Sequence, residues 1–141
     1  MTSLRSGVKL GLMKKLSTYL FLILFSFSAP SFGDYKWKKI GKNTAGDVAY
    51  VDLSSIKKVG NKVYYFDLLD YVTPTDQGHL SGKTYKEVNC LDLSFRYLKD
   101  FYYLEPMGNG KVDLINDKKS EWYNNKKGSL GERLRKFVCN Y

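Results

Sequence analysis

The sequence is poor in the residues that metal sites and many catalytic sites require. It contains one histidine, His79, and two cysteines among its 141 residues. One histidine cannot form the HExxH zinc motif, and two separated cysteines are a poor zinc site. A phosphate-binding loop and a dinucleotide fingerprint are also missing from the sequence. We therefore expect no catalytic, cofactor-binding or metal-binding residues, and we expect that the protein is not an enzyme.

The N-terminal segment lacks acidic residues and a long hydrophobic run. Residues 1–33 contain four basic residues, and an apolar run over residues 19–25 follows the last of them. Small residues and Pro30 then lead to Gly33. This order of basic, apolar and small segments is typical of a secretory signal peptide, and the run is well short of the roughly 20 residues of a membrane-spanning helix. We predict a signal peptide over residues 1–33, with an uncleaved anchor or a translation start at Met13 as alternatives.

The remainder, residues 34–141, is predicted to be a single exported domain. No later run is long and apolar enough to cross a membrane, and no cysteine at the predicted cut is available to accept a lipid. Removal of the leader lowers the net charge from +9 to +5, because the leader carries four basic residues and no acidic one. We expect a periplasmic, secreted or cell-surface protein that is not a lipoprotein.

The two cysteines, Cys90 and Cys139, are predicted to form one disulfide bond. They belong to no CxxC pair, and in an oxidising compartment two such thiols usually pair with each other. The bridge would close a loop of about 50 residues, for which chain entropy gives a stabilisation of about 4 kcal/mol. Two free thiols are the alternative.

Twelve tyrosines and an alternation of apolar with polar residues predict a sheet in residues 34–141. The expected strands cover residues 35–40, 48–52, 61–72, 84–93, 94–104 and 112–115. In the fifth of these, alternation places Phe95, Tyr97, Phe101 and Tyr103 on one face of the strand, and Asp100 and Tyr102 on the other. Residues 53–56 resemble one helical turn capped by Asp52 or Ser54, and residues 73–82 and 106–110 are rich in turn formers.

The last segment changes to a helical period. Ser129 and Glu132 form a capping box, and Leu130, Leu134, Phe137 and Val138 then recur at helical spacing. Arg133, Arg135 and Lys136 occupy other faces of this helix. We predict an α+β fold, in which a single antiparallel sheet of about five to six strands is covered by a C-terminal helix. The predicted disulfide would tie this helix to the sheet.

Three groups of polar residues were considered as functional sites. His79 lies in a loop without an evident orienting partner, which favours an exposed histidine over a ligand or a base. Asp67 and Asp70 fall on opposite faces of one strand, so they are not predicted to act as a catalytic pair. Seven lysines with aromatic neighbours cluster in the first half of the domain, at positions 36, 38, 39, 42, 57, 58 and 62. Since the protein is predicted to be exported and has few arginines, we expect no nucleic-acid partner.

The ordered motifs of the domain resemble those of the surface-adhesin protein E family of Gram-negative bacteria. The matching segments are residues 50–56, 60–63, 69–71, 81–83, 87–90, 106–112, 128–132 and 137–139, with Arg96 and Trp122 between them. The resemblance covers nearly all of residues 35–139. It implies a small antiparallel sheet with a C-terminal helix held by the cysteine pair, and adhesion to proteins at a surface. The sequence differs from the family pattern in two ways. It lacks the lipid-accepting cysteine of some members, and residues 123–127 replace a proline-containing segment.

The leading functional hypothesis is an exported, non-enzymatic binding module. Its expected partner is an extracellular or envelope protein, with an anionic glycan or lipopolysaccharide as the other partner of suitable charge. The alternatives are a small-ligand carrier, for example of haem, that uses His79 and neighbouring tyrosines, and a structural subunit of an envelope complex.

Overall fold

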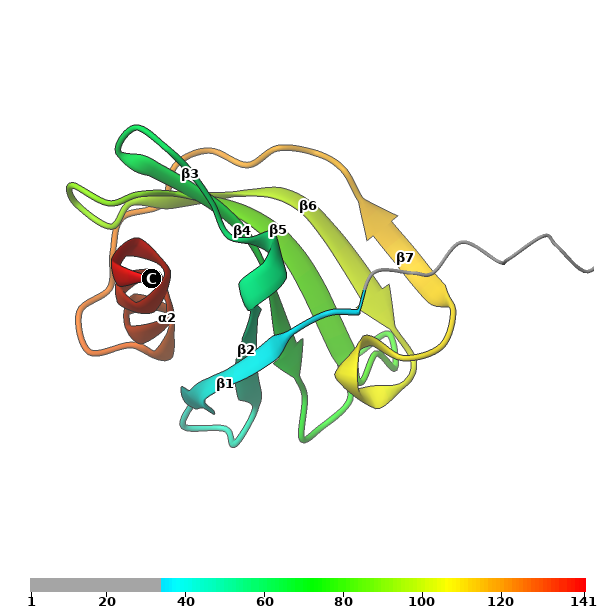
Figure 1. Cartoon of the computed structure of the whole chain (residues 1–141). Helices are drawn as coiled ribbons and strands as arrows, with labels where there is room; N and C mark the ends of the chain where they lie inside the picture. Colours follow the sequence, from blue (N-terminus) through cyan, green and yellow to red (C-terminus); the bar gives the residue numbers. More distant parts are fainter. Residues whose placement is uncertain (1–33) are drawn as a thin grey trace, which may run out of the picture. The chain divides into compact units, whose positions relative to one another are not determined.

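The computed structural model describes residues 34–141, so the predicted signal peptide and most of its cut site lie outside the described residues. Seven strands form one antiparallel sheet, and α2 (Leu130–Asn140) lies against one side of it (Figure 1). The strands are β1 (Trp37–Lys42), β2 (Val48–Asp52), β3 (Lys57–Val59), β4 (Lys62–Asp70), β5 (Ser81–Asn89), β6 (Phe95–Tyr103) and β7 (Val112–Asn116). This arrangement confirms the predicted α+β fold.

The strand order is β1-β2-β4-β5-β6-β7, and β3 pairs with the first part of β4. The long strands β4 and β5 lie at the centre of the sheet. Both strands have buried side chains on each of their two faces. β3 was not expected from the sequence. Its three residues are all exposed, and such a short segment shows no periodicity; it is a strand because the turn at Gly60 returns the chain onto β4.

The helix covers the core that the sequence predicted for it. Leu134 and Val138 are buried on α2, and they belong to one cluster with Val51, Val63 and Val88 of the sheet. The disulfide between Cys90 and Cys139 joins the end of β5 to the last turn of α2, which confirms the predicted pairing. Hydrophobic packing and a covalent bond therefore fix the same helix to the same face.

A bulge in β6 overturns the expected alternation of its side chains. Tyr85 pairs with Lys99 and Lys86 pairs with Tyr97, so Leu98 is an extra residue without a partner on β5. An extra residue reverses the face on which every preceding side chain lies. Tyr97 therefore shares a face with Asp100, and not with Phe101 as the simple alternation predicted.

Two short 3-10 helices complete the domain. Asp52 accepts a hydrogen bond from the Ser54 backbone at the start of η1 (Leu53–Ser55), as the predicted cap requires. The second, η2 (Pro106–Gly108), packs on β4 and β5. It is held there because Asp70 accepts a hydrogen bond from the Met107 backbone at 2.6 Å, and Ser81 accepts one from the Gly108 backbone at 2.8 Å.

Candidate functional site

A cleft of about 590 Å³ opens between the sheet and the N-terminal end of α2. Its floor is formed by side chains of β4, β5 and β6 that lie on the same face as the core, and its wall is formed by Leu130, Gly131 and Leu134. The helix packs mainly on β1, β2 and β4, which leaves the neighbouring part of this face open. We call this feature the cleft.

Three residues in register cross the floor of the cleft. Asp67 of β4 pairs with Thr84 of β5, which pairs with Asp100 of β6. Lys86 donates a hydrogen bond to Asp67 at 2.5 Å. Burial raises the pKa of Asp67, although the Lys86 ammonium opposes this shift. The ionisable side chains that line the cleft besides its tyrosines are therefore two carboxyl groups and one ammonium group.

Tyrosine rings surround these carboxyl groups. Tyr71, Tyr97 and Tyr102 line the cleft, and Tyr97 does so because of the bulge in β6. A Cβ atom on Gly82 would lie 2.9 Å from the Tyr71 hydroxyl, so glycine allows the ring to lie directly over the strand. Burial raises the pKa of Tyr71 to about 12, with a further contribution from the aspartates nearby. Burial and Asp100 also raise the pKa of Tyr102, so both phenols stay protonated at neutral pH.

His79 is buried, which corrects the expectation of an exposed histidine. Only 2% of its surface is exposed. Its Nε2 atom lies 2.8 Å from a carboxylate oxygen of Asp113, and its Nδ1 atom lies 3.3 Å from the Thr75 hydroxyl. Asp113 is the extra residue in a bulge of β7, 34 positions away, and for that reason the sequence did not reveal it as a partner. A metal could bind the ring only after one of these contacts is broken.

Asp67 and Asp70 lie on opposite faces of β4, as predicted. Asp67 lines the cleft, while Asp70 holds the backbone of η2 on the other side of the sheet. Within residues 34–141, no three side chains of His, Cys, Asp and Glu converge in a way that would hold a metal ion. Asp67 and Asp70 therefore do not act together across the strand.

The opposite side of the sheet carries half-buried aromatic rings. The Phe66 ring lies 4.8 Å from the Tyr85 ring and 6.3 Å from the Phe101 ring. Lys99 lies over Phe101, and Ile115, paired with Phe101 on β7, is 52% exposed. We call this surface the aromatic face. It presents half-buried rings beside an exposed isoleucine, on the side of the sheet opposite α2.

A buried carboxylate organises the end of the aromatic face. Glu87 is 1% exposed, and it accepts hydrogen bonds from Arg96 at 2.5 Å and Tyr64 at 3.0 Å, while Lys62 lies 2.9 Å away. Burial disfavours its ionisation, but these three donors hold the pKa of Glu87 below its usual value. Arg96 and Lys62 also lie over the ring of Trp122. The charge of Glu87 is thus fully matched, and one positive charge is in excess.

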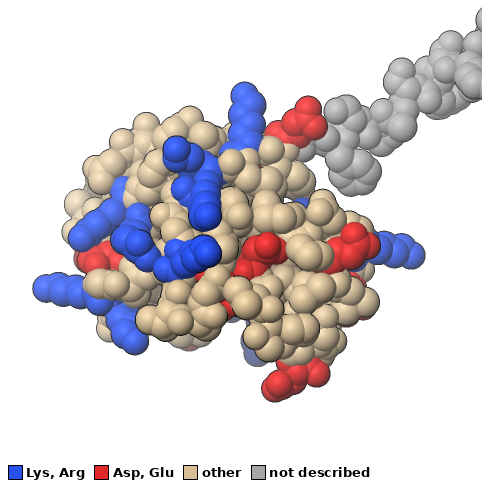
Figure 2. Space-filling model, turned by 90° about the horizontal axis from the view of Figure 1, so that it is seen from below, with Lys and Arg blue, Asp and Glu red and all other residues tan. Residues whose placement is uncertain are grey.

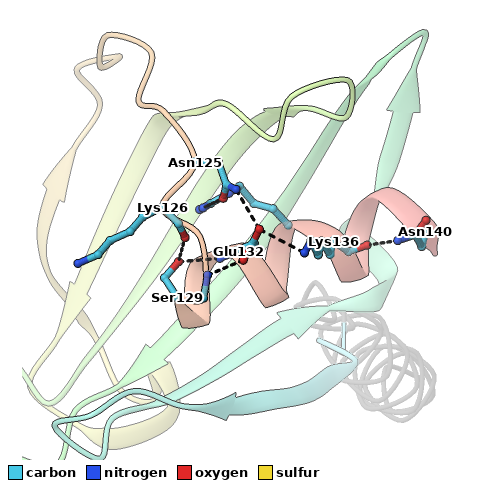
Figure 3. A network of polar contacts seen from close by, with 8 residues as sticks. Asn125, Lys126, Ser129, Glu132, Lys136 and Asn140 are labelled. Carbon is cyan, nitrogen blue, oxygen red and sulfur yellow. Dashed lines mark hydrogen bonds and ion pairs between the residues drawn. The ribbon is translucent and has the colours of Figure 1, made fainter.

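Figure 3 shows the polar contacts at the start of α2. Ser129 accepts a hydrogen bond from the Glu132 backbone at 3.0 Å, and the Glu132 carboxylate accepts one from the Gly128 backbone at 2.6 Å. Glu132 also accepts a bond from Asn125, and these contacts lower its pKa to about 2. The predicted capping box is present, but the carboxylate bonds one residue earlier than in the standard motif. The Glu132 carboxylate therefore joins the first turn of the helix to the segment that precedes it.

Arg135 is buried, although helical spacing predicts it on another face of the helix than the apolar residues. The guanidinium group of Arg135 lies 4.1 Å from the centre of the Phe95 ring, and it donates a hydrogen bond to Asn125 at 2.7 Å. Among residues 34–141, no acceptor bonds to its Nε atom. Burial lowers the pKa of Arg135.

Basic side chains gather on the outer surface of β1 and α2. Figure 2 shows blue side chains over the half of the molecule that carries these two elements. The exposed basic residues there are Lys38, Lys39, Lys42, Arg133 and Lys136. Arg133 also bonds the backbone of Lys42 at 3.0 Å, which joins the helix to the edge strand. We call this area the basic surface.

A family model described as surface-adhesin protein E matches residues 37–140 of the chain. The chain belongs to the surface-adhesin protein E family. The match spans every strand and the helix, and the family is one of binding proteins. No curated protein sequence matches the chain significantly.

Solved structures of protein E from Haemophilus influenzae share the fold. One is similar with a TM-score of 0.57 at 19% identity, over 74% of this chain and 83% of the other. A second crystal form gives a TM-score of 0.55 at 19% identity, over 71% and 86% of the two chains. Protein E from a non-typeable strain gives 0.53 at 19% identity, over 80% and 81%. Within residues 34–141, no helix is long and apolar enough to span a membrane.

Proposed function

We propose that residues 34–141 act outside the cytoplasm as a non-enzymatic binding module, and that the aromatic face contacts an acidic surface of an envelope or extracellular protein. The observation that supports this proposal most strongly is the row of half-buried rings beside the exposed Ile115. Tyrosine, tryptophan, phenylalanine and arginine are enriched in protein interfaces, and such side chains carry most of the binding energy.

The charge of the aromatic face supports an acidic partner. Lys99 lies over Phe101, and Lys62 and Arg96 flank Trp122. The buried Glu87 neutralises only one of these cations. Positive charge at the rim of an apolar patch increases the rate of association with a negative partner and selects against a positive one.

Export is supported by the leader and by the disulfide. Residues 1–33 have the pattern of a signal peptide, and disulfide bonds persist mainly in oxidising compartments. In this proposal the mature chain starts near Asp34 and is not a lipoprotein. Its final location is the periplasm or the cell surface.

The basic surface supports a second candidate partner, an anionic glycan or lipopolysaccharide. Five exposed cations on β1 and α2 provide the charge that such a polymer requires. The haem-carrier alternative has less support, because both ring nitrogens of His79 already have partners. A structural subunit of an envelope complex would use the same aromatic face. The identity of the crosslinked partner distinguishes this alternative from a binding module.

Photo-crosslinking in the producing cell tests the proposal. A benzoylphenylalanine replaces Lys99 on the aromatic face or, as the matched position, Arg133 on the basic surface. We expect a protein adduct from position 99 only, in the fraction outside the cytoplasm, and we expect Tyr85→Ser to abolish it. Adducts from position 133 alone would favour the glycan or lipopolysaccharide surface. Recovery of only the unprocessed chain in the cytoplasm would overturn the proposal.

A further inference from the structure

The cleft contains a buried carboxylate that the chain itself does not neutralise. Asp100 is 9% exposed. Among residues 34–141, its only side-chain hydrogen bond comes from the Asn116 amide, which reaches Oδ2 at 3.3 Å. By contrast, the ammonium group of Lys86 neutralises Asp67, two strands away. A buried carboxylate without a cation is costly, so its retention on the floor of an open cleft calls for an external partner.

The basic side chain that lines the cleft, Lys86, is not available to bind an anion. Lys86 is committed to Asp67 at 2.5 Å. The Glu132 N–H group at the start of α2 is committed to Ser129, and the Gly128 N–H group before the helix is committed to the carboxylate of Glu132. The side chains that line the cleft therefore include two carboxyl groups and one ammonium group, and an anionic ligand would meet the charge of Asp100.

The walls suit a long, flexible cationic side chain. Leu69, Leu130 and Leu134 provide an apolar surface along which the methylene groups of lysine or arginine can pack. The rings of Tyr71 and Tyr102 can contact the charged end through their faces, whereas Lys86 already lies over the ring of Tyr97. Burial, with a smaller contribution from Asp100, raises the pKa of Tyr71 and Tyr102, so both phenols are neutral beside Asp100. The volume of about 590 Å³ falls in the range of small-ligand sites.

We propose that the cleft binds a lysine or arginine side chain of a partner protein, with its cationic group at Asp100 and its methylene groups against Leu69 and Leu130. This site lies on the opposite side of the sheet from the aromatic face, and it does not depend on the function proposed for that face. The chain would then engage basic side chains at one surface and an acidic protein at the other.

An NMR titration of the ¹⁵N-labelled domain, residues 34–141, tests the cleft. The probe is the peptide acetyl-Ala-Lys-Ala-amide, and the comparison peptides replace lysine with glutamine or glutamate. We expect the lysine peptide to shift the backbone signals of Gly82, Thr84 and Asp100, and to bind more weakly as sodium chloride is raised. The glutamine peptide should bind several-fold more weakly, and the glutamate peptide should not bind.

Two variants test whether peptide binding depends on the charge of Asp100. Asp100→Asn keeps the volume and the contact with Asn116, and we expect it to weaken the lysine peptide by about tenfold. Asp92→Asn is the matched control, because it removes the same charge from an exposed turn at the other end of the sheet, and we expect unchanged binding. Equal binding of the lysine and glutamine peptides, or unchanged binding in Asp100→Asn, would overturn the proposal. Shifts at Phe101 and Ile115 instead of Gly82 and Thr84 would also overturn it.

Gly82→Ala provides a second test that leaves the charge intact. Its methyl group would meet the Tyr71 hydroxyl at 2.9 Å and the Tyr102 ring at 3.5 Å, so it displaces the rings over the floor of the cleft. We expect weaker lysine-peptide binding in a variant that keeps the dispersed NMR spectrum of the folded domain. Full affinity in the folded Gly82→Ala variant would contradict a site on this floor.

Discussion

Two buried carboxylates on opposite faces of the sheet, Glu87 and Asp100, differ in how the chain neutralises them. On the aromatic face, Glu87 has three donors from Arg96, Lys62 and Tyr64. In the cleft, Asp100 has one amide partner at 3.3 Å. Both residues belong to the same group of central strands. A fully matched charge stabilises the fold, whereas an unmatched charge beside an opening is available to a ligand.

The helix α2 packs on the face of the sheet that carries the cleft, and the Cys90–Cys139 disulfide ties α2 to the end of β5. We expect the double substitution Cys90→Ser and Cys139→Ser to lower the free energy of unfolding by about 4 kcal/mol. Urea denaturation of the oxidised, reduced and substituted domain measures the effect. Reduced wild type should match the double variant, and an effect below about 1 kcal/mol would show that packing alone holds α2. Lysine-peptide binding should decline with the helix, since α2 forms the wall of the cleft.

The two carboxylates give the next largest effect and the most direct contrast between the faces. Glu87→Gln leaves Arg96 and Lys62 without their counter-charge, and we expect it to cost about 3 kcal/mol of stability. Asp100→Asn removes a charge that no cation matches, and we expect stability to be kept or increased, without a loss. Chemical denaturation at pH 7 measures both. Equal losses in the two variants would remove the distinction between a matched and an unmatched charge.

Gly82→Ala has a smaller expected effect on stability. Its methyl group must displace the Tyr71 ring, and overpacking of this kind costs about 1–3 kcal/mol. Because Tyr71 lines an open cleft and can move outward, we expect the lower end of this range. Thermal unfolding of Gly82→Ala beside a matched Thr84→Ala variant measures the cost. A loss of stability above about 3 kcal/mol would show that the Tyr71 ring cannot move outward into the cleft.

The strands and the helix were predictable because their side-chain periods are visible in the sequence. Tyr64 and Phe66 alternate with the buried Val63 and Tyr65 on β4. Leu130, Leu134 and Val138 repeat along α2. The disulfide was predictable because only two cysteines are present. These features are local or depend on simple counting.

The cleft was not predictable, because it depends on residues that are distant in the sequence and on one extra residue. Leu98 bulges out of β6 and moves Tyr97 onto the face of Asp100. A single inserted residue reverses a period-two pattern, and nothing local marks where it lies. His79 was misjudged for a similar reason, since a second bulge brings Asp113 to it from β7.

Acid unfolding gives the smallest and most specific effect. The contacts at the start of α2 lower the pKa of Glu132 to about 2, from 4.5 for a free glutamate. A lowered folded-state pKa contributes stability that is present above pH 4.5 and is lost as the pH falls toward 2. We expect Glu132→Gln to be less stable at neutral pH and to show a smaller loss across this window. Denaturation at several pH values, with Glu121→Gln as the exposed control, measures the difference. The same loss of stability between pH 4.5 and 2 in wild type and Glu132→Gln would contradict the assignment.

The central claim is that the unmatched charge of Asp100 is a binding group, and a double-mutant cycle tests it most directly. The cycle combines wild type and Asp100→Asn with the lysine and glutamine peptides, and it uses the four dissociation constants. We predict a coupling energy of about 1 kcal/mol between Asp100 and the peptide lysine. A coupling energy of zero, with both substitutions acting independently, would contradict the claim.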